Sequence, residues 1–137
     1  MLTKFQGIKI YFVAPPPLKM KEDILAYLRK RGVEYAEENT LERVLPEVEV
    51  VYQTRIQKER FGDRLEDYDA SRGIYVINKD TLKLMKPNTI IMHPLPRVDE
   101  IAMEVDDDPR AAYFRQAQNG LYVRMALLSK VLESAPR

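Results

Sequence analysis

Hydrophobic and polar positions along the chain form short apolar runs separated by amphipathic stretches. Runs rich in β-branched and aromatic residues predict strands at residues 8–13, 33–36, 48–52, 74–77 and 89–93. The stretches between them predict helices at about residues 21–31 and 80–86, and a brief helix that Asn39 or Thr40 caps and Pro46 ends. This alternation predicts an α/β fold, a mostly parallel sheet with helices on both faces.

The last part of the chain predicts one long helix, with Asp108 as its N-cap and Pro109 at its first helical position. One apolar stripe, spaced by three and four residues, consists of Phe114, Ala117, Leu121, Met125, Leu128 and Leu132. A second stripe consists of Tyr113, Val123, Leu127 and Val131. A helix that is apolar over so wide an arc predicts a partner on more than one side.

Composition narrows the class of protein. The 137 residues suit one domain with a core, and 45% hydrophobic with 31% charged residues is an ordinary globular mix. A net charge of +1 does not indicate the basic surface of a nucleic-acid-binding protein. No apolar run approaches the ~20 residues that a membrane-spanning helix needs. Without cysteine and with one histidine, the chain has no disulfide framework and no thiolate or histidine-rich metal site. We therefore expect a cytoplasmic protein that binds neither metal, membrane nor nucleic acid.

Two loops, residues 53–61 and 93–100, directly follow predicted strands, where open parallel sheets collect their ligands. In the first, Arg55 carries a planar cation that suits a carboxylate, and Gln57 offers both a donor and an acceptor. Together they fit recognition of a small dicarboxylate or an amino acid. The alternative is a surface ion pair, because the loop also carries Glu59 and most loop charges are solvated.

The second loop has proline at positions 94 and 96. Proline fixes φ and removes an N–H donor, so this loop is predicted to be stiff, with carbonyl oxygens available to hold an amide or ammonium group. The alternative is a rigid turn that only ends a strand. We interpret His93 as a strand-end histidine bonded to backbone rather than as a catalytic group.

Several motifs together resemble the signatures of aspartate carbamoyltransferases. They are residues 10–15 (IYFVAP), 52–61 (YQTRIQKERF), 92–101 (MHPLPRVDEI) and 108–117 (DPRAAYFRQA). The resemblance runs in order over essentially the whole chain. Ornithine enzymes of the family carry a cysteine in the loop that matches residues 93–96, and its absence favours the aspartate branch. The resemblance implies a Rossmann-like aspartate-binding domain over residues 1–137, with the family's carbamoyl phosphate domain absent.

The resemblance also implies a reaction and its binding residues. The family joins carbamoyl phosphate to L-aspartate, which gives N-carbamoyl-L-aspartate and phosphate for pyrimidine synthesis, and needs no cofactor or metal. By this likeness Arg55 grips an aspartate carboxylate and Gln57 helps to position it. Pro94, Leu95 and Pro96 offer backbone carbonyls to the carbamoyl amide and the aspartate amine.

The same resemblance assigns Arg60 to domain closure and residues 58–71 to a mobile loop. The family's phosphate loop, catalytic histidine and intersubunit lysine precede this segment, so the catalytic set is incomplete here and the isolated chain is expected to be inactive. The family's last helix packs on that preceding domain. We therefore expect the carboxyl-terminal helix to bind a carbamoyl phosphate domain or a second copy of the chain.

A different class of function stays open at this point. The chain fits a non-catalytic binding or regulatory module that docks on a full transcarbamoylase. Loss of Arg55 or of the two prolines would favour that alternative, and all three are present.

Overall fold

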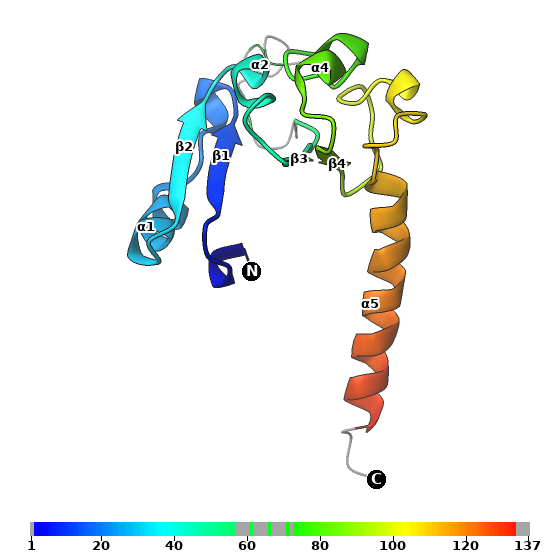
Figure 1. The fold of residues 1–137 in the computed structure, drawn as a ribbon. Helices are drawn as coiled ribbons and strands as arrows, with labels where there is room; N and C mark the ends of the chain where they lie inside the picture. Colours follow the sequence, from blue (N-terminus) through cyan, green and yellow to red (C-terminus); the bar gives the residue numbers. More distant parts are fainter. Residues whose placement is uncertain (1, 57–60, 62–65, 67–70, 72, 134–137) are drawn as a thin grey trace. The chain divides into compact units, whose positions relative to one another are not determined.

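The fold is described from a computed structural model (Figure 1). The structure describes residues 2–56, 61, 66, 71 and 73–133. The chain divides into two compact units, the first comprising Met1–Glu47 and Ile56–Tyr75, the second Val48–Arg55 and Val76–Arg137. Each unit has one parallel pair of strands among its described residues, so the predicted α/β class with parallel strands is confirmed.

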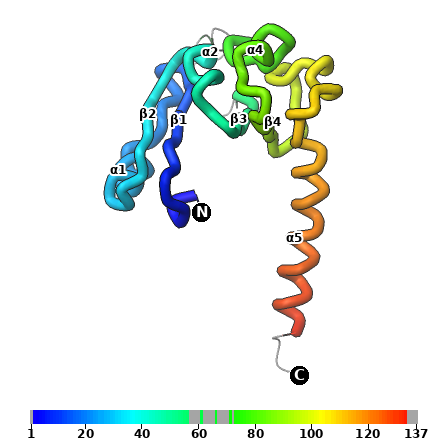
Figure 2. Tube along the Cα trace, viewed as in Figure 1, coloured from blue at the N-terminus to red at the C-terminus, as the bar shows by residue number. Residues whose placement is uncertain are grey.

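The first unit is built around a β–α–β connection (Figures 1 and 2). Strand β1 (Lys9–Val13) pairs with β2 (Glu34–Glu38), in a register that runs from Lys9 opposite Glu34 to Val13 opposite Glu38. Helix α1 (Glu22–Lys30) connects them and ends before Gly32, whose φ of 65° is the left-handed conformation common after helices. Short helical elements complete this unit: η1 (Leu2–Lys4), η2 (Pro16–Leu18) and α2 (Leu41–Val44).

The second unit pairs β3 (Val50–Tyr52) with β4 (Ile90–Met92). Helix α4 (Lys79–Leu84) precedes β4, and η4 (Met103–Val105) and the long α5 (Tyr113–Glu133) follow it. The core of this unit contains several side chains that are almost wholly buried: Ile77, Ile91, Ile101, Val105 and Tyr113.

Strand β4 is bonded on both edges. One edge carries β3, and on the other Ile91 N–H donates to the Arg110 carbonyl while its own carbonyl accepts from Ala112 N–H, both at 2.8 Å. Ala111 therefore pairs with β4 instead of lying in a helix, and the first helical residue is Tyr113, four residues later than the predicted Pro109. Asp108 instead closes a turn, where its carboxylate accepts from the Arg110 backbone N–H and from Nε, each at 2.9 Å.

The strand predicted at residues 74–77 is also wrong in extent. Only Ile77 pairs, through a parallel bridge to Ile101. The next residue, Asn78, caps α4, because its side-chain oxygen accepts from the backbone N–H groups of Asp80 and Thr81 at 3.0 Å. Residues 74–76 have no neighbouring strand to pair with among the described residues.

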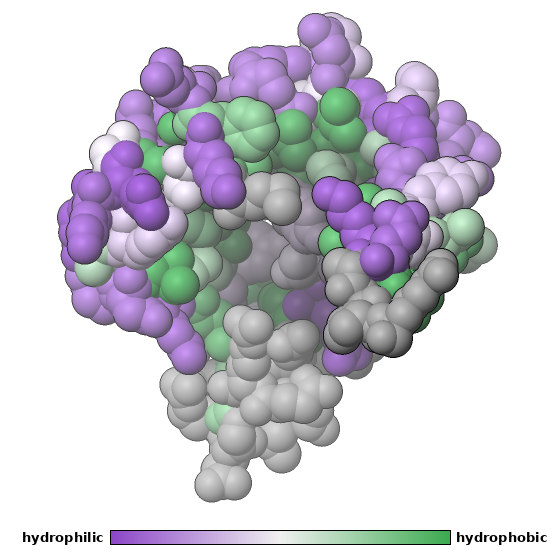
Figure 3. All heavy atoms as spheres, turned by 90° about the horizontal axis from the view of Figure 1, so that it is seen from below, coloured by the Kyte–Doolittle hydropathy of each residue, from purple (hydrophilic) through white to green (hydrophobic). Residues whose placement is uncertain are grey.

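Helix α5 has little covering within its own unit, from which it extends (Figure 1). Tyr113 is fully buried, but the apolar side chains of later turns are exposed: Phe114, Leu121, Tyr122, Val123, Met125, Leu127, Leu128, Val131 and Leu132. Elsewhere on the chain too, hydrophobic residues reach the surface between hydrophilic ones (Figure 3). Apart from Tyr113, the residues of both predicted apolar stripes are thus exposed in this structure.

Among the described residues, no helix combines the length and the apolar character that crossing a membrane requires.

Two neighbouring isoleucines of β4 provide a test of this core. Ile91 is fully buried and Ile90 is 41% exposed. We expect Ile91→Ala to lower the free energy of unfolding by about 2–5 kcal/mol, because it removes buried methylene groups and leaves a cavity. Ile90→Ala is the matched control and should cost well under half as much. Urea unfolding of both variants gives the comparison, and equal losses would contradict the assignment of Ile91 to the core.

Candidate functional site

The two candidate loops leave neighbouring points of the second unit. They follow β3 and β4, which are adjacent and parallel, so both loops begin at the same edge of the sheet. Gln53 extends the pairing by one step, since its N–H donates to the Met92 carbonyl at 2.9 Å. Adjacent strands lie about 4.8 Å apart, which brings the starts of the two loops within the length of a small ligand.

Arg55 is exposed, three residues beyond the end of β3. A guanidinium offers a planar set of donors, which suits a carboxylate. Gln57 and Arg60, the other residues predicted for this loop, lie outside the described residues, as does most of the predicted mobile loop. Their roles stay predictions.

The second loop begins at His93, which is 2% exposed. Its ring Nδ1 accepts from the Leu95 backbone N–H at 2.8 Å, and its Nε2 lies 2.7 Å from Oε1 of Glu100. The interpretation of His93 as a strand-end residue bonded to backbone is confirmed. The contact with Glu100 was not predicted, although a carboxylate seven positions after the only histidine was visible in the sequence.

The carbonyl-bearing residues lie between His93 and Glu100. Pro94 and Pro96 are exposed and Leu95 is half-buried, with a φ of 47° and a cis peptide bond to Pro96. Within the described residues, no hydrogen bond uses the carbonyl oxygens of these three residues. The predicted acceptors thus have no hydrogen-bond donor among the residues that the structure describes.

The Glu100 side chain is hydrogen-bonded to other residues of the same loop. This carboxylate is 6% exposed, and its Oε2 accepts from the backbone N–H groups of Val98 and Asp99, each at 3.2 Å. Together with His93 on Oε1, three donors satisfy one buried side chain.

Arg97 fixes the far part of the loop to the start of α5. Its guanidinium binds both carboxylate oxygens of Asp106, and the Tyr113 hydroxyl donates to the same carboxylate. The hydrogen bond from Arg97 holds the pKa of Asp106 below its ordinary value. Burial, helped by the nearby Asp106 carboxylate, raises the pKa of Tyr113 to about 12.

Gln116, in the first turn of α5, contacts both strand ends. Its Oε1 accepts from His93 N–H at 3.0 Å and its Nε2 donates to the Tyr52 hydroxyl at 3.3 Å. Nothing in the sequence pattern marked this residue, because a glutamine on a helix is ordinarily solvated. Its position depends on the late start of α5.

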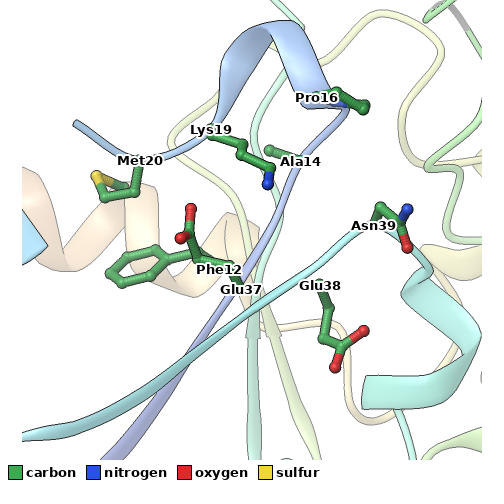
Figure 4. Close-up of a pocket in the computed structure, with 8 residues that line it drawn as sticks. All are labelled: Phe12, Ala14, Pro16, Lys19, Met20, Glu37, Glu38 and Asn39. Carbon is green, nitrogen blue, oxygen red and sulfur yellow. The ribbon is translucent and has the colours of Figure 1, made fainter. Parts of the chain in front are cut away.

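The first unit contains a separate cavity of about 240 Å³ at the carboxyl ends of β1 and β2 (Figure 4). It is lined by Phe12, Ala14, Pro16, Lys19, Met20, Glu37, Glu38 and Asn39. None of the residues predicted to bind a ligand lies there. Among the described residues, no group of three or more histidine and acidic side chains is arranged to hold a metal ion.

Comparison with known proteins gives one consistent family. The family model described as "Aspartate/ornithine carbamoyltransferase, Asp/Orn binding domain" matches residues 1–131. A chloroplastic aspartate carbamoyltransferase of Arabidopsis thaliana is 58% identical over 132 residues, which are 96% of this chain and 34% of that protein.

Solved structures agree. The catalytic subunit of M. jannaschii aspartate transcarbamoylase superimposes with a TM-score of 0.86 at 41% identity, over 98% of this chain and 44% of that one. The Trypanosoma cruzi aspartate transcarbamoylase in complex with carbamoyl phosphate and aspartate gives a TM-score of 0.82 at 38% identity, over 93% and 42%. The chain thus spans between about a third and under a half of the length of these relatives.

The Arg97–Asp106 contact predicts a pH-dependent contribution to stability. A carboxyl group whose pKa is lowered by folding stabilises the protein above its unfolded pKa of about 3.9, and this stabilisation is lost as the pH falls through the folded value. We expect Asp106→Asn to lower the free energy of unfolding by about 1–3 kcal/mol at pH 7. The difference from wild type should shrink below about pH 4. Chemical unfolding across a pH series measures both.

The exposed neighbour Asp107 supplies the control. Asp107→Asn removes the same charge without touching Arg97, so its effect should stay within about 0.5 kcal/mol at every pH. Equal effects of the two substitutions at pH 7 would rule out a specific contribution from the Arg97 contact.

Proposed function

Because this chain belongs to the aspartate/ornithine carbamoyltransferase Asp/Orn-binding domain family, we propose that it is the L-aspartate-binding half of an aspartate carbamoyltransferase. The observation that carries the proposal is the common origin of its two loops. Arg55 and the carbonyl-rich residues 94–96 follow adjacent parallel strands, so a cation that suits a carboxylate and acceptors that suit an amine begin at the same edge of the sheet. The Trypanosoma cruzi relative, solved with carbamoyl phosphate and aspartate, supports this choice of substrates.

The proposed reaction joins two substrates held side by side. The aspartate amine nitrogen attacks the carbonyl carbon of carbamoyl phosphate, a C–N bond forms, the C–O bond to phosphate breaks, and the proton lost by the amine leaves with the phosphate. In this scheme Arg55 binds an aspartate carboxylate and Gln57 helps to orient it. The carbonyls of Pro94, Leu95 and Pro96 accept from the carbamoyl amide and the amine.

These groups position substrate rather than exchange its protons. Orienting the two reactants lowers the activation free energy of the transfer by several kcal/mol. Stabilising the departing phosphate needs cations, however, and none of these proposed contacts brings a cation to the phosphate. We therefore assign that part of the chemistry to a carbamoyl phosphate domain. Arg60 is proposed to bind across to that domain when the site closes.

The exposed face of α5 supports this division of labour. Its two apolar stripes are accessible over most of the helix, and an apolar surface of that extent is typical of an association site. The proposed occupant is the carbamoyl phosphate domain, or a second copy of the chain where that domain is missing.

The cytoplasm is proposed as the compartment. The chain has no cysteine and therefore no disulfide bonds of the kind common in secreted proteins. The Arabidopsis thaliana relative, in contrast, is named as chloroplastic. Fractionation of the source cells decides between the two.

Carbamoyl transfer tests the proposed function. Purified chain alone should give no transfer above background at millimolar substrates, and addition of a separately made carbamoyl phosphate domain should produce aspartate-dependent transfer. In that mixture Arg55→Ala should lower kcat/KM for aspartate roughly 10- to 100-fold, because each charge-assisted hydrogen bond contributes about 1.5–3 kcal/mol. Production of carbamoyl aspartate from radiolabelled aspartate is the measurement.

Arg43→Ala is the control, since Arg43 is an exposed arginine on α2. It should leave transfer unchanged. Full turnover by the chain alone would contradict the division of the site between two domains. Unchanged kcat/KM in Arg55→Ala would remove Arg55 from the aspartate site, and binding to a complete transcarbamoylase without any transfer would favour the regulatory module instead.

Charge placed on α5 tests its proposed contact. Leu127→Lys with Val131→Lys puts two ammonium groups on the second apolar stripe, so both self-association and binding of the carbamoyl phosphate domain should weaken at least tenfold. The control pair is Ala126→Lys with Ser129→Lys, which adds the same charge on the other side of the helix. Light scattering over a concentration series, with and without the other domain, gives the affinities.

Circular dichroism checks that both α5 variants are folded. Equal binding by the two variants would show that the second stripe is not part of the contact. A wild-type chain that stays monomeric and does not bind the other domain would contradict the proposed association altogether.

A further inference from the structure

The most constrained side chain beside the candidate site is that of His93. It makes three contacts that involve three different parts of the second unit. Its ring nitrogens contact Leu95 N–H at 2.8 Å and Glu100 Oε1 at 2.7 Å, while its backbone N–H donates to Gln116 at 3.0 Å. A ring that is 1% exposed has no water to replace a lost partner.

These contacts determine where the ring carries its hydrogen. Leu95 N–H is a donor, so the Nδ1 that receives it must be unprotonated. The hydrogen of the neutral ring then lies on Nε2, from which it is donated to Glu100. Glu100 is in turn held by two backbone N–H groups on its other oxygen, which fixes the direction of the imidazole.

The fixed imidazole in turn constrains the backbone conformation of Leu95. Its φ of 47° lies in the left-handed region, which is unfavourable for a residue with a side chain. Among the described residues, the hydrogen bond from its N–H to the ring is the one that ties the backbone of residues 94–96 to a buried side chain, because Pro94 and Pro96 have no N–H to donate. The orientation of the Pro94–Leu95 peptide, and hence of its carbonyl, is therefore coupled to the position of the imidazole.

We infer that His93 and Glu100 are positioning residues, which hold the backbone of Pro94 and Leu95 so that their carbonyl oxygens face the substrate nitrogen atoms. This inference rests on the proposed function for the identity of the substrate. It gives His93 no direct contact with substrate. The ring acts through Leu95 N–H, and Glu100 acts through the ring.

Two substitutions of His93 distinguish the contact of Nδ1 with Leu95 from the contact of Nε2 with Glu100. His93→Asn keeps an acceptor near the position of Nδ1 and loses the reach to Glu100. His93→Gln keeps a donor near the position of Nε2 and loses the acceptor for Leu95. A positioning role predicts that KM for aspartate rises roughly three- to tenfold in His93→Gln, which loses the contact with Leu95 itself, and rises less in His93→Asn, which loses only the indirect support from Glu100.

Stability should follow the opposite order. His93→Asn leaves the buried Glu100 carboxylate without its ring partner, so it should unfold at lower urea concentration than His93→Gln. A purely structural role would make KM follow stability, and His93→Asn would then be the worse enzyme. That outcome overturns the inference, as does an unchanged KM in both variants.

Nuclear magnetic resonance on the chain alone tests the contact without any activity. His93 is the only histidine, so long-range proton–nitrogen spectra contain one imidazole. At pH 8 an unprotonated Nδ1, together with slow exchange of the Leu95 amide that survives in His93→Asn and is lost in His93→Gln, supports the inference. A protonated Nδ1, or fast exchange of that amide in the wild type, overturns it.

The two readouts also distinguish this inference from the proposed function. If the wild-type chain gives no aspartate-dependent transfer with the carbamoyl phosphate domain, both the proposed function and the positioning role are contradicted. If transfer is normal but His93 is protonated on Nδ1, the positioning role is contradicted and the proposed function is not.

Discussion

The pairing of β4 on both of its edges is the constraint from which the rest of the second unit follows. Ile91 is hydrogen-bonded through both its N–H and its carbonyl to residues 110 and 112, while β3 occupies the other side of the strand. This arrangement places the loop that follows β3, the loop that follows β4 and the first turn of α5 around one strand end. Gln116 then contacts both strand ends from the helix. A short strand of three residues thus organises every described part of the candidate site.

Much of this was predictable from the sequence because it depends on local pattern. The apolar runs and their turn residues located β1, β3 and β4 to within two residues. The loops after β3 and β4 were found because their chemistry, arginines in one and two prolines in the other, is unusual directly after a strand. The backbone bonding of His93 followed from its place at a strand end.

The rest depends on contacts between distant residues. Residues 110–112 were read as helix because Asp108 and Pro109 form a strong local start signal, yet pairing with Ile91 outweighs that signal and delays α5 to Tyr113. The apolar run at residues 74–77 lacks a neighbouring strand along most of its length, which no local pattern reports. Gln116 and Glu100 were missed for the same reason, since their partners are set by tertiary placement.

The conformation of Leu95 has a consequence for how this loop meets a ligand. A residue with a φ of 47° between two prolines has few other conformations available, and a buried imidazole selects among them. The loss of backbone freedom therefore occurs when the protein folds rather than when a ligand arrives. Association with such a rigid acceptor carries a small entropic penalty, whereas a flexible segment would have to be ordered at every binding event. In the proposed function, residues 94–96 are thus a preorganised template, and a substrate that fits their carbonyls would gain affinity from rigidity as well as from hydrogen bonds.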